Sequence, residues 1–222
     1  MRLLVVTAVA AERDAVAAAI GDASTVVLAG GIGPASSASY TSAALAADSY
    51  DLVLSAGIAG GFDLPIGAVV VASRVVYAQL GRETPDGFEP LGSAVASLDV
   101  EPGLVAELAG RSGATTGAVL TVSTVTGTAR TADALRARYP DAVAEAMEGF
   151  GVATAALVHG VPFGEIRAIS NAVGPRDRAA WRVDDALAAL AKAVAAVAGA
   201  ARRSPFPLAR TTRSSSTPGP TG

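Results

Sequence analysis

Two patterns of apolar and polar positions alternate along the chain. Short runs rich in β-branched residues, such as residues 3–9, are continuous enough to be strands buried on both faces. Between them, small and apolar residues recur every three or four positions, as in amphipathic helices. The predicted strands are 3–9, 25–29, 51–56, 69–77, 119–125 and 161–169, and the predicted helices are 11–20, 35–47, 102–109, 129–138 and 183–201. Strands that alternate with helices predict an α/β domain with a mostly parallel or mixed sheet and helices on both faces.

A further helix is predicted after Pro140 and Asp141, a typical helix start. Its apolar face would consist of Val143, Met147, Phe150, Thr154 and Leu157. Glu148 lies next to this face, where packing gives no reason for a carboxylate. Gly149 and Gly151 beside it would let other backbone or a ligand come close. Glu148 could accept hydrogen bonds from two neighbouring hydroxyls of a ligand, or it could pair with an arginine at the edge of the core.

Polar or glycine-rich groups follow four of the predicted strands. Glu12 comes after the first strand, the glycine-rich segment 57–62 after the third, Thr126 after the fifth, and Asn171 after the sixth. In open α/β sheets the carboxyl ends of the strands form the edge where ligands bind. We therefore expect a site at this edge, although Glu12 would also be an ordinary partner of a helix dipole.

Composition limits the chemistry available to such a site. The 222 residues suffice for one domain, expected over 1–201, while 202–222 is rich in Ser, Thr, Pro, Arg and Gly and is expected to be a disordered tail. Cysteine is absent, which excludes disulfides, Cys-ligated zinc and a thiol nucleophile. A lone histidine, His159, excludes a His-rich metal site and is expected to end a helix. No metal and no cofactor are predicted.

Charge and hydropathy narrow the range of partners. The net charge is −3, and no cluster of Lys or Arg lies outside the tail, which argues against nucleic acid. Residues 3–9 resemble a short secretory signal, but Glu12 and Arg13 follow at once, and a buried strand is the favoured interpretation. No uncharged apolar run reaches the roughly 18 residues of a membrane span. We expect a cytoplasmic protein that binds a small molecule and further copies of itself.

Taken in order, these segments resemble the nucleoside phosphorylase and nucleosidase superfamily over about residues 1–200. Met147-Glu148 is similar to the ribose-binding Met-Glu pair of that superfamily, and Arg167-Ala-Ile-Ser170-Asn171 to its base-binding Arg-x-x-Ser-Asp/Asn segment. Glu12 matches the acidic residue that handles water in the hydrolytic members. The resemblance implies a single domain with a twisted, mixed β-sheet flanked by helices. Within the superfamily the chain looks most like the methylthioadenosine/S-adenosylhomocysteine nucleosidases and the futalosine hydrolases of menaquinone biosynthesis.

Asn171 distinguishes between these two groups. The adenine-directed nucleosidases carry Asp at this position, which can protonate N7 of the base and accept from its exocyclic amine. Asn171 has no proton to deliver, but its NH2 group can donate to N7 and O6 of a 6-oxopurine such as hypoxanthine. The substitution therefore favours hypoxanthine or guanine as the base. Futalosine is an inosine derivative with an aromatic carboxylate tail at its 5′ position. The segment 171–178 also looks like that of the futalosine hydrolases.

The resemblance implies a division of tasks during cleavage of an N-glycosidic bond, which builds positive charge on the ribose and negative charge on the base. Glu148 would bind the 2′- and 3′-hydroxyls and stabilise the oxocarbenium ion, and Glu12 would deprotonate the water that acts as nucleophile. Asn171 would hold the leaving base, in an orientation set by Ser170 and Arg167. The other expected substrate contacts are Met147 at the sugar, Ile58, Ala59 and Gly60 along sugar and base, Val125, Thr126 and Trp181 as apolar walls of the base slot, and Phe88 from a neighbouring subunit of a homodimer or higher homo-oligomer.

Three alternatives remain open at this point. A phosphorylase would use inorganic phosphate in place of water, but Arg13 is the only basic residue near the first turn, and Glu12 would repel an anion. A methylthioadenosine/S-adenosylhomocysteine nucleosidase would act on adenine. A binding module for purine nucleosides would need Glu148 and Asn171 but not Glu12. For Trp181, core packing at a helix start is as good an interpretation as a wall of the base slot.

Overall fold

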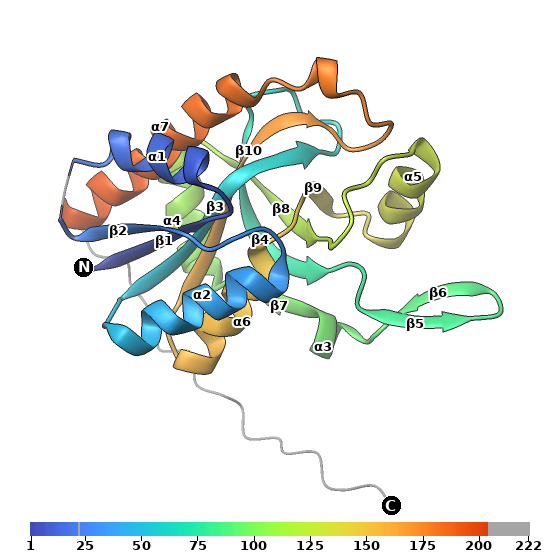
Figure 1. Ribbon diagram of the computed structural model, residues 1–222, viewed down its shortest axis with the longest axis horizontal. Helices are drawn as coiled ribbons and strands as arrows, with labels where there is room; N and C mark the ends of the chain where they lie inside the picture. Colours follow the sequence, from blue (N-terminus) through green and yellow to red (C-terminus); the bar gives the residue numbers. More distant parts are fainter. Residues whose placement is uncertain (22, 204–222) are drawn as a thin grey trace, which may run out of the picture.

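A mixed β-sheet forms the centre of the domain, and helices cover it on both sides (Figure 1). The computed structural model describes residues 1–21 and 23–203, so positions 204–222 of the expected tail lie outside the described residues. Within the described residues the sheet has eight strands, and β5 and β6 pair separately as a hairpin. The strands are β1 Leu3–Thr7, β2 Thr25–Ala29, β3 Leu52–Gly61, β4 Val69–Tyr77, β5 Gly81–Thr84, β6 Gly87–Pro90, β7 Ser97–Asp99, β8 Thr115–Thr121, β9 Ala142–Ala146 and β10 Phe163–Ala172. The helices are α1 Ala10–Ala19, α2 Pro34–Ala47, α3 Ser93–Ala96, α4 Pro102–Ser112, α5 Ala129–Arg138, α6 Gly149–His159 and α7 Val183–Arg203, with a 3-10 turn at Arg178–Ala180.

The sheet closes on itself. β3 pairs with β10, β10 with β4, β4 with β8, β8 with β9, and β9 with β3, so five strands form a ring. β1 and β2 extend this ring from β3 as a parallel wing. The last strand, β10, runs parallel to β3 and antiparallel to β4. The expected mixed sheet with helices on both sides is confirmed, whereas its closure was not predicted.

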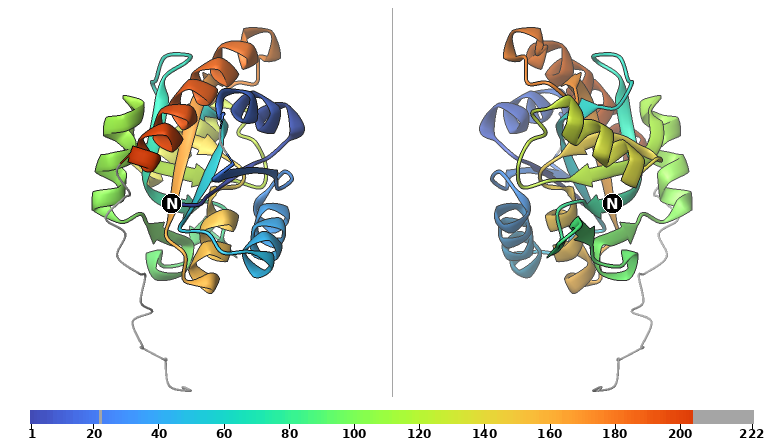
Figure 2. Two further views of the ribbon diagram at one scale, coloured as in Figure 1. Left: turned by 90° about the vertical axis from the view of Figure 1, so that its left-hand side faces the viewer. Right: turned by 90° about the vertical axis from the view of Figure 1, so that its right-hand side faces the viewer.

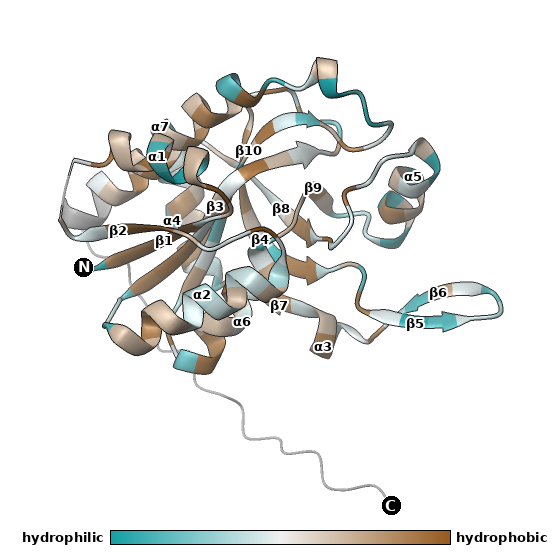
Figure 3. Cartoon of the chain, viewed as in Figure 1, coloured by the Kyte–Doolittle hydropathy of each residue, from teal (hydrophilic) through white to brown (hydrophobic). Residues whose placement is uncertain are grey.

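The described core consists of three apolar clusters, and β1 contributes to two of them, on opposite faces of the sheet. Leu3 and Val5 pack with α1, α4 and α7, while Leu4 and Val6 pack with α2 and α6. Successive side chains of a strand point to opposite faces, so a strand that is covered twice must be apolar at every position. Figure 2 shows these two helix groups on opposite sides, and Figure 3 shows the apolar central strands beside the polar hairpin β5–β6.

The long helix α7 confirms the predicted last helix. It extends two residues beyond the predicted end, to Arg203, and buries Leu190, Val194 and Val197 on one face. Despite its length, neither α7 nor any other helix among residues 1–21 and 23–203 is apolar enough to cross a lipid bilayer.

The predicted helix after Pro140 and Asp141 is wrong in its first half. Residues Ala142–Ala146 form β9, which pairs with β8 on one side and with β3 on the other. A short run of small apolar residues fits a strand or a helix equally well, and here pairing with two neighbouring strands decides. Glu148 is consequently the N-cap residue of α6 and does not lie inside a helix.

Other boundaries also differ from the predicted ones. β10 spans Phe163–Ala172 and not 161–169, so Ser170 and Asn171 lie inside this strand. β3 continues through the glycine-rich segment to Gly61, because β10 pairs with it along that whole length. β8 spans Thr115–Thr121 and not 119–125, so Val125 and Thr126 lie in the loop that follows it. The polar loop 81–92 contains the hairpin β5–β6.

The contact between α2 and α6 yields a stability prediction. A Cβ atom on Gly151 would lie 2.1 Å from the Pro34 carbonyl oxygen and 2.4 Å from Ser37 Oγ. We expect Gly151→Ala to lower the free energy of unfolding by about 1–3 kcal/mol, because the helices must move apart. Gly110→Ala in α4 is the matched control: a Cβ there meets nothing within 4 Å, and it should stabilise by about 0.5–1 kcal/mol. Urea denaturation measures both, and a Gly151→Ala protein as stable as the parent would contradict the close helix contact.

Candidate active site

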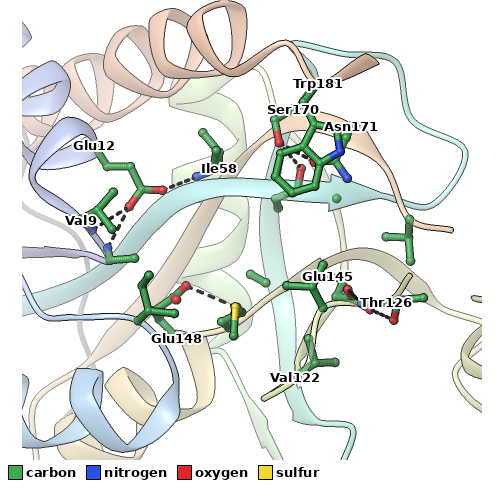
Figure 4. Close-up of a pocket in the computed structure, with 18 residues that line it drawn as sticks. Val9, Glu12, Ile58, Val122, Thr126, Glu145, Glu148, Ser170, Asn171 and Trp181 are labelled. Atoms are coloured by element: carbon green, nitrogen blue, oxygen red, sulfur yellow. Dashed lines mark hydrogen bonds between the residues drawn. The ribbon is translucent and has the colours of Figure 1, made fainter. Parts of the chain in front are cut away.

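A cavity of about 260 Å³ opens near the carboxyl ends of β1, β3, β8, β9 and β10 (Figure 4). It brings together residues that are far apart in the sequence, which is the arrangement predicted for the strand ends. The lining residues are Ala8, Val9, Glu12, Ile32, Ile58, Ala59, Gly60, Val122, Val125, Thr126, Glu145, Ala146, Met147, Glu148, Ser170, Asn171, Val173 and Trp181. In Figure 4, Glu12 and Glu148 lie toward one end of the cavity, and Ser170, Asn171, Glu145 and Thr126 lie toward the other.

Glu12 is buried and is held by three backbone N–H groups. Its Oε2 accepts from the N–H of Ala8 at 2.9 Å and of Val9 at 3.2 Å, and its Oε1 accepts from the N–H of Ile58 at 2.9 Å. The bond to Val9 is a helix-capping bond, so the structural role considered for Glu12 is present. A carboxylate has about four acceptor sites, and these three bonds leave one free on Oε1. Glu12 can therefore cap α1 and still accept a proton from water in the cavity.

Glu148 reaches the cavity from the N-terminus of α6. Its Oε1 accepts from the N–H of Gly33 at 3.3 Å, and its Oε2 accepts from the N–H of Met147 at 3.3 Å and from Nη1 of Arg167 at 3.2 Å. The pairing with an arginine considered for Glu148 is thus real. It coexists with a position in the cavity wall, because Glu148 Oε1 keeps a free acceptor site.

Arg167 does not contact Asn171, which corrects its predicted role in orienting that residue. The Arg167 side chain is buried and does not line the cavity. Its Nε donates to Glu165 Oε1 at 2.7 Å and its Nη2 to Ser55 Oγ at 2.9 Å, in addition to the bond with Glu148. A buried guanidinium needs counter-charges, and Arg167 forms its ion pairs with Glu148 and Glu165. Arg167 therefore positions Glu148.

Burial acts on the pKa values of Arg167 and Glu165 in opposite directions. Burial lowers the pKa of Arg167, but the carboxylates of Glu165 and Glu148 outweigh that effect, so the pKa stays above its ordinary value. Burial raises the pKa of Glu165, against the opposing effect of Arg167. Oε2 of Glu165 is buried without a hydrogen-bond partner among the described residues. Burial of Glu165 thus favours its protonated form.

Ser170 orients Asn171, as predicted. Ser170 Oγ donates to Asn171 Oδ1 at 2.7 Å, which turns the amide NH2 group the other way. One N–H of Asn171 donates to the carbonyl of Ala172 at 2.9 Å, so one N–H is left for a ligand where two were predicted. A single N–H can be shared between two acceptors on one edge of a base. Trp181 lines the same part of the cavity.

Glu145 is the site residue that the sequence analysis missed. Its carboxylate is buried and accepts from the N–H of Thr126 at 2.9 Å and from the Thr126 hydroxyl. Burial raises the pKa of Glu145, and the bonds from Thr126 act against that effect. Thr126 is therefore a polar anchor, and the prediction of an apolar wall is wrong for this residue. Along β9, the side chain of Glu145 points to the face opposite to that of Ala144 and Ala146. The predicted helix hid this alternation.

The remaining predicted residues divide into two groups. Met147, Ile58, Ala59, Gly60 and Val125 line the cavity as expected. Phe88 does not: it lies on β6, half-exposed, with the guanidinium carbon of Arg138 4.9 Å from its ring centroid. A contact of Phe88 with a substrate in a second copy of the chain stays a prediction. His159 ends α6 and shares a hydrogen bond with Ser42, away from the cavity.

The sequence of the chain matches a known protein family. A sequence model of the Phosphorylase superfamily matches residues 6–204. The chain belongs to the Phosphorylase superfamily. Among the members of this superfamily, it is 52% identical to the futalosine hydrolase of Streptomyces coelicolor, over 89% of this chain and 95% of that protein. It is 46% identical to the futalosine hydrolase of Acidothermus cellulolyticus, over 90% and 91% of the two chains. The methylthioadenosine/S-adenosylhomocysteine nucleosidase structure from Neisseria meningitidis shares the fold, with a TM-score of 0.79 at 20% identity, over 90% of this chain and 99% of that one.

No group of three or more His, Asp or Glu residues within residues 1–21 and 23–203 is arranged to hold a metal ion. The polar groups of the cavity are instead carboxylates, an amide and hydroxyls, which bind hydroxylated and hydrogen-bonding ligands.

Arg167→Met should destabilise this superfamily member by roughly 3–5 kcal/mol at neutral pH, because Glu148 and Glu165 would remain buried without a counter-charge. Arg82→Met, which removes an exposed ion pair with Glu89, is the control and should change little. Denaturation as a function of pH adds a second readout. An acid whose folded pKa is raised destabilises the fold as pH rises toward that pKa, so the deficit of Arg167→Met should shrink from about pH 7 to about pH 5. A deficit that does not change with pH would contradict unpaired carboxylates as its cause.

Proposed function

We propose that this protein is a futalosine hydrolase, which cleaves the N-glycosidic bond of a 5′-modified 6-oxopurine nucleoside and releases hypoxanthine in menaquinone biosynthesis. The observation that carries this proposal is the neutral amide of Asn171, fixed by Ser170, at the end of a cavity whose other end holds the buried carboxylates of Glu12 and Glu148. The extensive identity to proteins named futalosine hydrolase supports the same conclusion.

At the sugar end, Glu148 accepts hydrogen bonds from the ribose hydroxyls, and Met147 packs against the ring. As the bond between C1′ and N9 lengthens, positive charge on the ribose is stabilised by the carboxylate of Glu148. A water molecule attacks C1′, and Glu12 takes up its proton through the free acceptor site on Oε1. The base leaves with the electron pair of the C1′–N9 bond and takes a proton from solvent, so the products are the free sugar and the neutral base.

At the base end, Asn171 donates its remaining N–H to the N7 and O6 edge of hypoxanthine. Asn171 has no proton to give, so it stabilises negative charge on the leaving base by hydrogen bonding alone. An amide N–H suits the O6 acceptor, whereas a carboxylate there would face O6 as like against like. This preference distinguishes the proposal from an adenine-directed nucleosidase.

Hydrolysis is favoured over phosphorolysis by the cavity wall. No arginine or lysine belongs to the described residues that line the cavity, and Arg13 pairs with Asp14 at the surface. A phosphate ion beside the sugar would need such cations or a helix N-terminus, and the N-termini of α1 and α6 that reach the cavity carry the carboxylates of Glu12 and Glu148, which would repel it. A binding module remains the non-enzymatic alternative, and it would need no group at the position of Glu12. A cytoplasmic location and assembly into a homo-oligomer stay predictions.

The purified protein should release hypoxanthine from futalosine at a rate that does not depend on inorganic phosphate. Base release is followed by chromatography with futalosine, inosine and methylthioadenosine as parallel substrates. Adenine release from methylthioadenosine without hypoxanthine release from futalosine would refute the role given to Asn171. Turnover that requires phosphate would instead identify a phosphorylase.

Glu12→Gln should lower the rate of base release by about 100-fold or more, because an amide cannot take the proton of water. A glutamine has one acceptor oxygen, so it can keep either the N–H of Ile58 or those of Ala8 and Val9, and the unfolding midpoint of the variant is therefore measured beside its rate. Asp14→Asn is the matched control on the same helix, since Asp14 is exposed and pairs with Arg13. Near-normal turnover of Glu12→Gln would exclude Glu12 as the base.

A further inference from the structure

The carboxylate of Glu145 has free hydrogen-bond acceptor sites, to which the proposed reaction gives no role. It lies in the cavity wall at 6% exposure, and its two oxygens each receive one donor, both from Thr126. Each carboxylate oxygen can accept two hydrogen bonds, so a second site on each is open to a ligand. Of the described residues, no arginine or lysine forms an ion pair with Glu145. The carboxylate of Glu145 is thus buried at the cavity, and its donors are the two neutral groups of Thr126.

The sheet register places Glu145 opposite Asn171. Glu145 on β9 pairs with Gly60 on β3, and Gly60 pairs with Asn171 on β10. Side chains that are paired in register on neighbouring strands point to the same face of a sheet. The contact that a Cβ on Gly60 would make with Asn171 Nδ2, at 3.3 Å, agrees with this geometry. Glu145 and Asn171 therefore flank Gly60 on the cavity side.

Gly60 keeps the space between these two side chains open. A Cβ there would also approach Val173 Cγ2 to 2.9 Å, so even alanine would crowd the slot. Neighbouring strands lie about 4.8 Å apart, which separates the backbones of β9 and β10 by about 10 Å across β3. A purine that is hydrogen-bonded at two edges spans about that width. The glycine leaves a flat floor for a planar base.

The two flanking groups differ in hydrogen-bonding character. Asn171 offers an N–H, whereas an ionised Glu145 offers acceptors only. A 6-oxopurine has acceptors at N7 and O6 and a donor at N1–H, while adenine has an acceptor at N1 and a donor at its 6-amino group. The backbone N–H of Thr126, which could have served the N1 acceptor of adenine, is already bonded to Glu145. This end of the cavity therefore presents an acceptor where adenine would need a donor.

We propose that Glu145 accepts the N1–H of the 6-oxopurine base and makes the site select hypoxanthine over adenine, with Thr126 holding the carboxylate in place. This inference rests on the proposed function, since it assumes a purine between Asn171 and Glu145. The burial that raises the pKa of Glu145 fits such a role, because a donor from the ligand replaces the solvation that the carboxylate lacks. A residue that only capped Thr126 would not need to face the cavity.

Binding of free bases tests the assignment without turnover. Calorimetry with hypoxanthine, adenine and 1-methylhypoxanthine, which lacks the N1 donor, is compared for the parent protein, Glu145→Gln and the control Glu107→Gln on α4. The parent should bind hypoxanthine about 10- to 100-fold more tightly than 1-methylhypoxanthine. Glu145→Gln should lose a similar factor for hypoxanthine and gain or keep adenine affinity, because a glutamine amide can donate to N1. Glu107→Gln should match the parent.

Two results would overturn the role of Glu145. One is equal affinity of the parent for hypoxanthine and 1-methylhypoxanthine, a measurement that needs no folded variant. The other is a Glu145→Gln protein, folded by its unfolding midpoint, whose ratio of hypoxanthine to adenine affinity is unchanged. If futalosine is hydrolysed and these ratios do not move, only the Glu145 assignment fails. If the parent binds hypoxanthine selectively but releases no base from futalosine or inosine, the proposed function fails and the assignment stands.

Discussion

The buried guanidinium of Arg167 is the constraint on which the site depends. It joins β10 to Ser55 on β3, to Glu165 on its own strand, and to Glu148 at the start of α6. A cation that is enclosed by the core cannot be left without its carboxylates, so the three elements have little freedom to shift against one another. The same carboxylate that neutralises Arg167 is the one offered to the cavity. The stability of the fold and the proposed function therefore share the ion pair between Arg167 and Glu148, one of the two that Arg167 forms.

Much of the fold was predictable because central strands and surface helices have different periods. β4 and α5 have the predicted bounds, since a β-branched run and a polar helix with three- to four-residue spacing leave little ambiguity. β9 was missed because five residues, three of them alanine, carry no decisive period. Its identity comes from pairing with β8 and β3. The closure of the sheet depends on the same long-range pairing and leaves no local signal.

The candidate site was predictable where a polar residue follows a predicted strand. Glu12, Ser170 and Asn171 belong to that class, and the structure brings them to one cavity. Glu148 was found as a carboxylate in an apolar segment, although its place in the secondary structure was wrong. Glu145 was missed because residues Ala142–Ala146 were predicted to be helical. In a helix, a single carboxylate at this position is ordinary. The ion-pair partners of Arg167, Glu148 and Glu165, could not be predicted either, because packing decides which groups a long side chain reaches.

The position of β10 within the ring has a consequence for biosynthesis. β3 and β4 each leave an edge unpaired until Phe163–Ala172 has been made and inserted between them. Most of the chain is therefore synthesised before its sheet can close, and open strand edges are prone to pair with other chains. Contacts between segments so far apart in sequence also favour slow folding. A chain that stops short of β10 lacks the arginine and the asparagine as well as the strand that completes the ring, so a truncated product has neither a closed sheet nor a working cavity.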